Sequence, residues 1–325
     1  GIAVKINTNI EGEPSFSDFG RILCAAREFQ ADSVAGIGGG SVMDVAKLVA
    51  ALLDGSRQVR MVVGNGLISE RRIPLICMPT TSGTGSEVSP NSILIDEEQH
   101  AKLGIISPYL VPDKVYVDPS LTLGLPPYVT AFTGMDALTH CIEAYTNRFA
   151  HPMIDTFALD GIRLISANLE KAFHDGDDLE ARSNLALGSL YGGMCLGPVN
   201  TTAVHALAYP LGSEYKIAHG ISNALLLPYI MEFNLPGSEK RYADIARAMG
   251  TGEEERDYDA AMKGILFIRN LIKNCGFPSR LSEIGIPASD IKKLAQGALK
   301  VQRLLKNNPR EISLADAESI YQKAY

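Results

Sequence analysis

The hydrophobic and polar positions follow two different patterns, and these divide the chain near residue 118. Before that point, short apolar runs alternate with Gly-rich turns and with a helical segment, VMDVAKLVAALLD, whose apolar residues share one face. The strands expected there are SVAGI at 33–37, RMVV at 60–63, PLICMP at 74–79, NSILID at 91–96, KLGIIS at 102–107 and VYVD at 115–118. Strands that alternate with helices predict a mostly parallel sheet with helices on its faces.

Two local features add to this picture of the first region. NSILID and KLGIIS are separated only by the polar EEQHA, so these two strands are expected to form an antiparallel hairpin. The chain opens with GIAVKINTNIEGEP, which has no initiator Met and has the pattern of a strand. We therefore expect an N-terminal segment to be missing from this sequence.

Beyond Pro119, long amphipathic segments replace the short apolar runs, and almost no strand pattern remains. The expected helices are 128–147, 152–173, 178–195, 198–211, 222–233, 239–249, 257–275, 289–298 and 314–325. Within the first of them, one apolar stripe is formed by Met135, Leu138, Cys141, Ile142 and Tyr145. The patterns thus predict an α/β domain over 1–118 and an all-α domain over 119–325.

Composition excludes several classes of protein. The net charge of −7 is spread without a Lys/Arg-rich run, which argues against nucleic acid or an anionic membrane as a partner. No apolar run approaches the roughly 20 residues of a membrane span, and the chain does not open with a signal peptide. Five cysteines without a C-x-x-C pair fit reduced core residues of a cytoplasmic protein.

The segment GIGGGSVMDVAK at 36–47 places glycines between a predicted strand and a predicted helix. Glycines let backbone N–H groups approach an anion, and a helix N-terminus adds about half a positive charge. Ser41 is expected to cap the helix, with Asp44 completing an arrangement similar to a capping box. A tight turn that binds nothing is the alternative, because the run is neither G-x-G-x-x-G nor a P-loop.

A second loop, MPTTSGTGSEVSPN at 78–91, follows another buried strand. Around its two glycines it carries five hydroxyl side chains, namely Thr80, Thr81, Ser82, Thr84 and Ser86. Open α/β sheets bind ligands at such strand ends. One loop of this kind is commonly a solvated turn, but two at the ends of two strands favour a phosphate-bearing ligand.

Three of the six histidines lie in two short runs that also contain a carboxylate. Asp136 and His140 in GMDALTHCIEAY are four residues apart, and therefore project from one face of a predicted helix. His205 lies in the helical AVHALA, and His219 is expected near a helix start or on a loop. Imidazoles and a carboxylate suit zinc or iron(II). Each could equally be a hydrogen-bonded core residue, and Glu143 on the same helix face could support a ligand or be solvated.

Together these motifs resemble the iron-containing (group III) alcohol dehydrogenase family. The resemblance spans nearly the whole chain and is carried by GIGGGSVMDVAK, MPTTSGTGSEVS, GMDALTHCIEAY, HALAYPLGSEYKIAHGISNALLLPYIMEFN and NPREISLADAESIYQKAY. It implies a Rossmann-like dinucleotide-binding domain over 1–118 and a helical metal-binding and substrate domain over 119–325. It also implies reversible hydride transfer between a small alcohol, with its aldehyde or ketone, and NAD or NADP. Iron(II) is the expected metal, with zinc as a possible occupant, and the protein is expected to be a homodimer or larger.

The resemblance also assigns roles to individual residues. Asp136, His140, His205 and His219 match the family's metal ligands in order, and His219 is also the expected catalytic residue near the nicotinamide. The residues expected to bind the cofactor are Gly39, Gly40 and Ser41 at the pyrophosphate, Thr80, Thr84 and Asn91 along the adenine–ribose and nicotinamide path, Lys102 at the nicotinamide-side ribose, and Asp44, Thr81 and Ser86 beside them.

The sequence departs from the family pattern in two places. Family members usually begin with a further strand–helix–strand unit, which carries the acidic residue associated with a preference for NAD. Some members have a further His where this chain has Tyr209, so a proton-relay role for that His does not transfer. The alternatives are a zinc-dependent enzyme like glycerol dehydrogenase or dehydroquinate synthase, and a truncated, non-catalytic metal- or nucleotide-binding protein.

Overall fold

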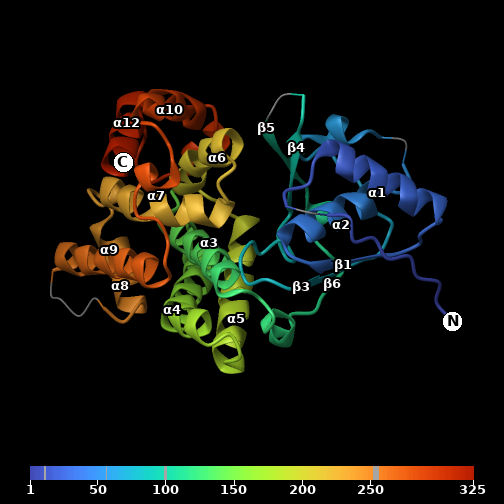
Figure 1. Cartoon of the computed structure of the whole chain (residues 1–325), viewed down its shortest axis with the longest axis horizontal. Coiled ribbons are helices and arrows are strands. Elements are labelled where there is room, and N and C mark those ends of the chain that lie inside the picture. The colour runs from blue at the N-terminus through green and yellow to red at the C-terminus, as the bar shows by residue number, and fades with distance from the viewer. Residues whose placement is uncertain (11, 56, 99–100, 252–255) are drawn as a thin grey trace. The chain divides into compact units, whose positions relative to one another are not determined.

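A computed structural model of the protein describes residues 1–10, 12–55, 57–98, 101–251 and 256–325 (Figure 1). The chain divides into two compact units. The first comprises Gly1–Thr81 and Gly85–Leu121, and the second comprises Ser82–Thr84 and Thr122–Tyr325. The first unit is α/β and the second is helical, which confirms the predicted fold class.

The first unit contains two small sheets. Its helices and strands are α1 (Phe16–Glu28), β1 (Val34–Gly38), α2 (Gly40–Leu52), β2 (Gly64–Asn65), β3 (Leu75–Pro79), β4 (Asn91–Asp96), β5 (Ala101–Ile106) and β6 (Lys114–Val115). Strands β1, β3 and β6 form a parallel sheet in that order, with Gly38 opposite Pro79. In the second sheet, of order β2-β5-β4, β4 and β5 are antiparallel, as predicted for this hairpin, whose residues 99 and 100 lie outside the described part.

Two strand predictions in this unit were wrong. RMVV at 60–63 lies mostly in a 3-10 helix, Val59–Val62. Only Val62 of that helix is buried. Arg60 forms an ion pair with Asp96 and lies over the ring of Phe16. The segment therefore packs through its side chains rather than through the backbone hydrogen bonds of a strand. Residues 1–10 form no helix or strand, because no described strand pairs with them.

Helix α1 was not predicted, although the sequence carries its start signal. Ser15 accepts a hydrogen bond from the backbone N–H of Asp18, and the Asp18 carboxylate accepts one from the N–H of Ser15. This capping box satisfies backbone donors that a helix start leaves unpaired. On the opposite side of the helix from the solvent, Phe16, Phe19 and Leu23 are buried.

The predicted cap of α2 was also wrong. Gly39 takes the N-cap position and has no side chain with which to cap, so Ser41 lies inside the first turn. Asp44 points elsewhere: it accepts hydrogen bonds from Ser86 Oγ at 2.5 Å and from the N–H of Ile93 at 2.9 Å. Two consecutive flexible residues, Gly39 and Gly40, let the helix begin earlier than the serine.

The second unit consists of packed helices. They are α3 (Pro127–Thr146), α4 (Pro152–His174), α5 (Leu179–Leu196), α6 (Ala203–Tyr215), α7 (His219–Asn234), α8 (Glu239–Ala248), α9 (Asp257–Asn274), α10 (Ile291–Leu299), α11 (Gln302–Leu305) and α12 (Leu314–Lys323). All nine predicted helices are present, and the short α11 is the one α-helix of the described residues in this unit that was not expected. No helix in the described ranges has the length and apolar character needed to cross a membrane.

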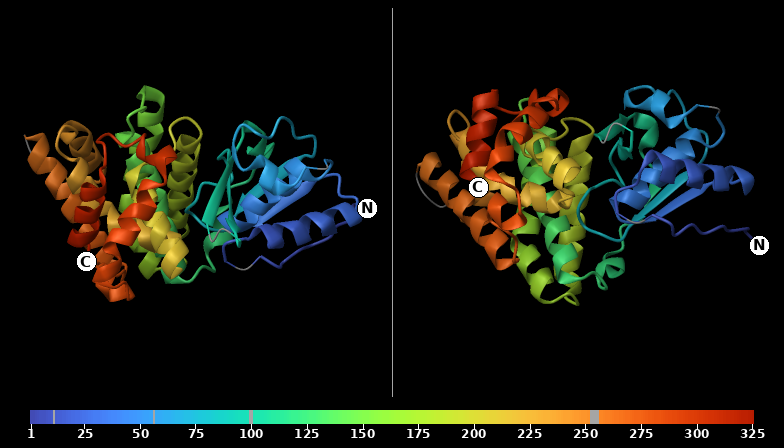
Figure 2. Two further views of the ribbon diagram at one scale, coloured as in Figure 1. Left: turned by 90° about the horizontal axis from the view of Figure 1, so that it is seen from above. Right: turned by 45° about the horizontal axis from the view of Figure 1, so that its top comes forward.

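Helix α3 is the centre of this unit. It packs against α4, α5 and α7, with α4 and α5 alongside it in green and yellow-green (Figure 2). Nearly every residue from Thr130 to Thr146 is buried, so the single apolar stripe predicted for this helix was too narrow. Small residues allow this close packing, since a Cβ at Gly134 would lie 2.4 Å from Leu169 and one at Gly161 would lie 2.6 Å from Cys141 Sγ.

All five cysteines are free thiols, as predicted. Four of them are buried, but Cys24 on α1 is exposed, so its assignment to the core was wrong.

Candidate metal centre and cofactor loops

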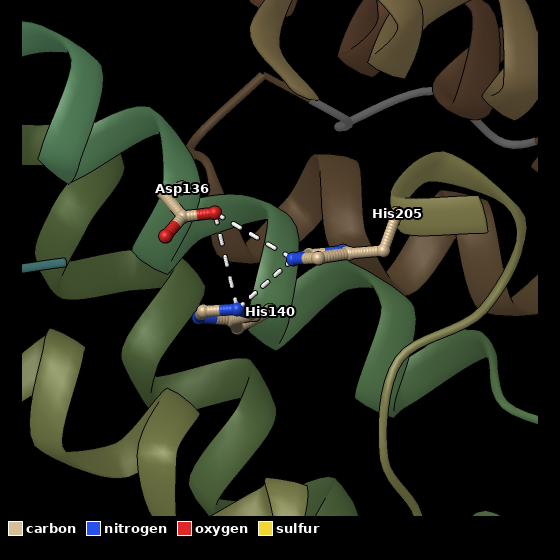
Figure 3. A group of neighbouring side chains, drawn as sticks. All are labelled: Asp136, His140 and His205. Carbon is tan, nitrogen blue, oxygen red and sulfur yellow. Dashed lines mark hydrogen bonds and ion pairs between the residues drawn. The ribbon is translucent and has the colours of Figure 1, made fainter. Parts of the chain in front are cut away.

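The second unit brings the four predicted metal ligands together. Asp136 and His140 project from α3, His205 from the first turn of α6, and His219 is the first residue of α7. Figure 3 shows the Asp136 carboxylate and the His140 and His205 rings pointing toward one another. Three of the side chains are at most 6% exposed, whereas that of His219 is 29% exposed. The group is therefore buried on all sides except that of His219.

The spacing of the ligand atoms fits one ion. Asp136 Oδ1 lies 3.9 Å from His140 Nε2 and 3.6 Å from the Nε2 atoms of both His205 and His219. His140 Nε2 and His205 Nε2 are 3.1 Å apart. Ligand atoms about 2.1 Å from a tetrahedral ion stand about 3.4 Å apart. The ligand atoms of Asp136, His140 and His205 all lie within 4.8 Å of one another, so these three can share one cation, and His219 Nε2 lies beside the Asp136 oxygen of this group.

Glu143 holds His205 in orientation. Its Oε2 lies 2.5 Å from His205 Nδ1, while Oε1 accepts hydrogen bonds from Thr202 Oγ1 and from the N–H of Val204, both at 2.7 Å. Donation from Nδ1–H to a carboxylate leaves the Nε2 lone pair for a metal. The sequence left the role of Glu143 open, and the structure places it, buried, behind a ligand.

Charge at the site also suits a cation. Burial raises the pKa of the Asp136 carboxyl, but the three surrounding histidines outweigh burial and hold that pKa well below its usual range. Burial likewise opposes ionisation of Glu143, and His205 outweighs it, so the pKa of Glu143 is lowered. Burial lowers the pKa of His140, whereas for His205 the neighbouring Glu143 and Asp136 outweigh burial and raise the pKa to about 10. Buried charges in proteins are paired or coordinate metals, so two buried carboxylates beside imidazoles fit the donor set of a metal centre.

Two further side chains lie at this centre. Asn223, one turn after His219 on α7, is fully buried among the ligands, and no sequence pattern pointed to it. Tyr209, one turn after His205 on α6, has its ring centroid 6.1 Å from that of His219. Its hydroxyl accepts a hydrogen bond from Arg303 Nη2 at 3.0 Å.

In the first unit, the structure brings the two predicted cofactor loops together. Gly39–Ser41 and Thr80–Thr81 follow adjacent parallel strands, and the N–H of Thr80 donates to the carbonyl of Gly38 at 2.9 Å. A Cβ at Gly39 would lie 3.6 Å from the Thr81 side chain. Backbone N–H groups at the start of α2 and the threonine hydroxyls therefore line the same edge of the sheet.

Close packing of α2 on β1 explains two of the glycines before it. A Cβ at Gly38 would lie 2.7 Å from Val42, and one at Gly36 would lie 2.8 Å from the Cβ of Ala46. Both distances are shorter than real contacts, so these positions need glycine for the helix to begin directly over the strand end.

The other predicted cofactor residues have protein partners inside the first unit. The buried Lys47 donates to Ser86 Oγ at 2.8 Å and also to the carbonyl of Asn91, and Ser86 in turn donates to Asp44. Lys102 on β5 pairs with Glu13. Asp44, Ser86 and Asn91 thus belong to a network that holds the loop 86–91 on α2.

Thr84 lies in the short segment Ser82–Thr84, which is part of the second unit. A Cβ at the middle residue, Gly83, would lie 2.7 Å from the Thr133 side chain of α3. This close approach to α3 requires glycine.

Comparison with known proteins identifies the family. The profile "Iron-containing alcohol dehydrogenase" matches residues 1–119, and "Fe-containing alcohol dehydrogenase family, C-terminal" matches residues 130–325. The chain belongs to the iron-containing alcohol dehydrogenase family. The family predicted from the motifs is thereby confirmed.

Individual relatives in this family are similar over the full chain. Long-chain-alcohol dehydrogenase 1 of Geobacillus thermodenitrificans (strain NG80-2) is 40% identical over 329 residues, covering 100% of this chain and 83% of that protein. A crystal structure of 1,3-propanediol oxidoreductase has a TM-score of 0.94 at 34% identity, covering 97% of this chain and 83% of the other. Sulfoacetaldehyde reductase from Bifidobacterium kashiwanohense, solved in complex with NAD+, has a TM-score of 0.89 at 28% identity over 98% of this chain and 82% of the other.

Proposed function

We propose that this member of the family is a metal-dependent alcohol dehydrogenase that transfers hydride reversibly between a small alcohol and NAD or NADP. The observation that carries the proposal is the convergence of Asp136, His140 and His205, whose ligand atoms lie 3.1–3.9 Å apart, with His219 Nε2 at 3.6 Å from Asp136 Oδ1. Family membership favours iron(II), and zinc also suits three imidazoles with a carboxylate. Bound there, the ion would supply Lewis acidity that polarises the alcohol oxygen.

The residues of the proposed metal centre would have different roles according to how deeply each is buried. Asp136, His140 and His205 are buried, whereas His219 is partly exposed and offers the accessible side of the site. A substrate oxygen would therefore approach beside His219, which is our candidate for the catalytic residue. The close packing around α3 excludes water from the other sides.

The first unit would bind the dinucleotide. Gly39, Gly40 and Ser41 at the N-terminus of α2 are proposed to bind the pyrophosphate through backbone N–H groups. Thr80 is proposed to line the adenine–ribose and nicotinamide path, with Thr81 beside it. Asn91 and Lys102 are proposed to complete the path, and Asp44 and Ser86 to shape it through the Lys47 network. A relative solved with NAD+ supports a nicotinamide cofactor.

The substrate and the setting are further parts of the proposal. Relatives are named for long-chain alcohols, 1,3-propanediol and sulfoacetaldehyde, which supports an alcohol or aldehyde as the substrate class. We propose a cytoplasmic homodimer or larger homo-oligomer, without nucleic acid or membrane partners.

The deciding experiment measures activity after metal removal and reconstitution. Purified protein is stripped with a chelator, reloaded anaerobically with iron(II), or with zinc, and tested against a panel of alcohols and aldehydes with NAD(H) and NADP(H). We expect activity only in loaded protein, with loss in His219→Ala but not in the control His174→Ala, whose side chain is 62% exposed. Full activity in the stripped protein would contradict the mechanism. If the protein binds metal but shows neither turnover nor a change in NAD(P)H fluorescence, the result would instead support the non-catalytic alternative.

A further inference from the structure

Asn223 occupies a position that the four-ligand description of the metal centre does not explain. It lies on α7 one turn after His219 and has no exposed surface. Its Nδ2 atom is 2.7 Å from Asp136 Oδ1 and 3.2 Å from the Nε2 atoms of both His205 and His219. Asn223 therefore contacts three of the four predicted ligands directly, at the atoms that would bind the ion.

The two ends of this amide differ sharply in their surroundings. The Nδ2 end faces the group of ligand atoms, whereas Oδ1 is buried and has no hydrogen-bond partner among the described residues. A buried polar atom without a partner destabilises the folded state. An amide retained at this cost needs a reason, and the adjacent ligand atoms provide one.

Electrostatics indicates how the amide would meet a cation. Amide hydrogens carry partial positive charge and would be repelled by an ion held between Asp136, His205 and His219, whereas the amide oxygen would be attracted to it. Nitrogen and oxygen occupy nearly the same space, so a half-turn of the amide exchanges them. That turn brings Oδ1, the atom without a partner, to the ligand group.

We propose that Asn223 is a fifth residue of the metal centre, which faces the bound ion with its amide oxygen. An additional oxygen donor suits iron(II), whereas structural zinc sites are commonly complete with four ligands. Asn223 would then raise the affinity for iron(II) more than the affinity for zinc. The inference rests on the proposed metal centre but not on turnover, so metal binding alone tests it.

The test compares Asn223→Ala and Asn223→Asp with the parent protein. Dissociation constants for iron(II), zinc and cobalt(II) are measured by chelator competition, and the visible spectrum of the cobalt(II) protein reports its coordination. The control is Asn234→Ala, since Asn234 is also buried on α7 but pairs with Asn308, outside the ligand group.

The two variants separate an oxygen ligand from a mere donor to Asp136. If the amide oxygen faces the ion, Asn223→Ala weakens iron(II) binding about 10–100-fold, the range typical of supporting residues, and shifts the cobalt spectrum. Asn223→Asp keeps an oxygen and should retain both the affinity and the spectrum. If Asn223 only donates to Asp136, the aspartate cannot donate and repels that carboxylate, so binding falls in both variants; this result overturns the proposal.

Two other outcomes are also decisive. Unchanged iron(II) affinity and an unchanged cobalt spectrum in Asn223→Ala would overturn the proposal, provided the far-UV circular dichroism shows a folded protein. If Asn223→Ala does not fold, Asn223→Asp decides alone. Failure of metal binding in the parent protein would count against the proposed function itself, which distinguishes the two.

Discussion

At the scale of residues, the candidate metal centre depends on side chains that hold the candidate ligands in place. Glu143 is buried, and its two carboxylate oxygens accept hydrogen bonds from His205 Nδ1, the Thr202 hydroxyl and the N–H of Val204. It therefore fixes both the ring of His205 and the start of α6. Such a contact determines which imidazole nitrogen is free for a metal.

Glu143→Gln should weaken metal binding. The amide keeps the shape of the side chain but loses the charge that holds His205, and loss of such supporting carboxylates typically costs about 10–100-fold in affinity. Chelator competition measures the change, and the exposed Glu311→Gln serves as the control. An affinity equal to that of the parent would show that His205 is held without Glu143.

Glu87 should make stability depend on pH. Burial raises its pKa from 4.5 to about 7, with Lys47 opposing the shift. The folded state therefore holds a proton that the unfolded state releases above pH 4.5. The stability that this proton gives the folded state is therefore fully present below pH 4.5. It declines as pH rises toward 7 and is absent above pH 7.

Glu87→Gln removes this dependence. The rise of the Glu87 pKa from 4.5 to about 7 corresponds to about 3 kcal/mol, so the variant should gain up to that much unfolding free energy over the parent at pH 8, and almost nothing at pH 4.5. Urea unfolding at the two pH values measures the difference, with Glu311→Gln as the exposed control. A variant that is less stable than the parent at pH 8 would contradict the expectation.

At the scale of elements, close helix packing sets the position of the ligands. Gly220, directly after His219, begins α7 against α3: a Cβ there would lie 2.1 Å from the carbonyl oxygen of Phe132 and 2.8 Å from its carbonyl carbon. These are backbone atoms, so no change of rotamer relieves the overlap. The glycine therefore allows His219 to reach Asp136 on α3.

Gly220→Ala should damage both the fold and the site. The start of α7 must move away from α3, which we expect to cost about 3 kcal/mol, at the upper end for overpacking, and to withdraw His219 from the ion. Thermal unfolding and chelator competition measure the two effects. Gly20→Ala in α1 is the matched control, since nothing lies within 4 Å of its Cβ, and it should stabilise its helix by about 0.5–1 kcal/mol. Equal behaviour of the two variants would refute the packing argument.

At the scale of the whole molecule, each unit has its own proposed ligand. The candidate metal ligands come from α3, α6 and α7, which are separated along the chain and belong to one helical unit. An ion that joins three helices stabilises that unit through binding to the folded state alone. The glycine and threonine loops belong to the α/β unit, apart from Ser82–Thr84.

Hydrogen exchange should resolve these two effects. Metal at about 100 times its dissociation constant adds about 2.7 kcal/mol to the folded state, so exchange should slow in α3, α6 and α7 but not in α1. Dinucleotide should slow exchange at the start of α2 and at Thr80–Thr81. His140→Ala, which lacks a ligand, should lose the effect of metal and serves as the control. Equal slowing by metal in both units would contradict the separation.

The sequence predicted elements well where one local pattern decides the backbone. Helices of the second unit begin and end within a few residues of expectation, apart from the first turns of α6 and α7, because apolar spacing and flanking Gly or Pro act locally. The strand prediction for RMVV was wrong because four apolar or basic residues do not show whether a neighbouring strand exists to pair with them. The alternating Ile2, Val4 and Ile6 failed for the same reason, and all three are exposed.

The sequence by itself determined the helical character of the second unit, the two glycine and hydroxyl loops, and the four candidate ligands. Each of these features depends on a short motif of residues that are close together along the chain. Only the tertiary structure decided that Glu143 supports His205, that Asp44 turns to Ser86, and that Asn223 contacts Asp136. Those contacts join residues that are 42–87 positions apart. Their partners are fixed by the packing of whole helices, which depends on many contacts at once and leaves no short pattern to read.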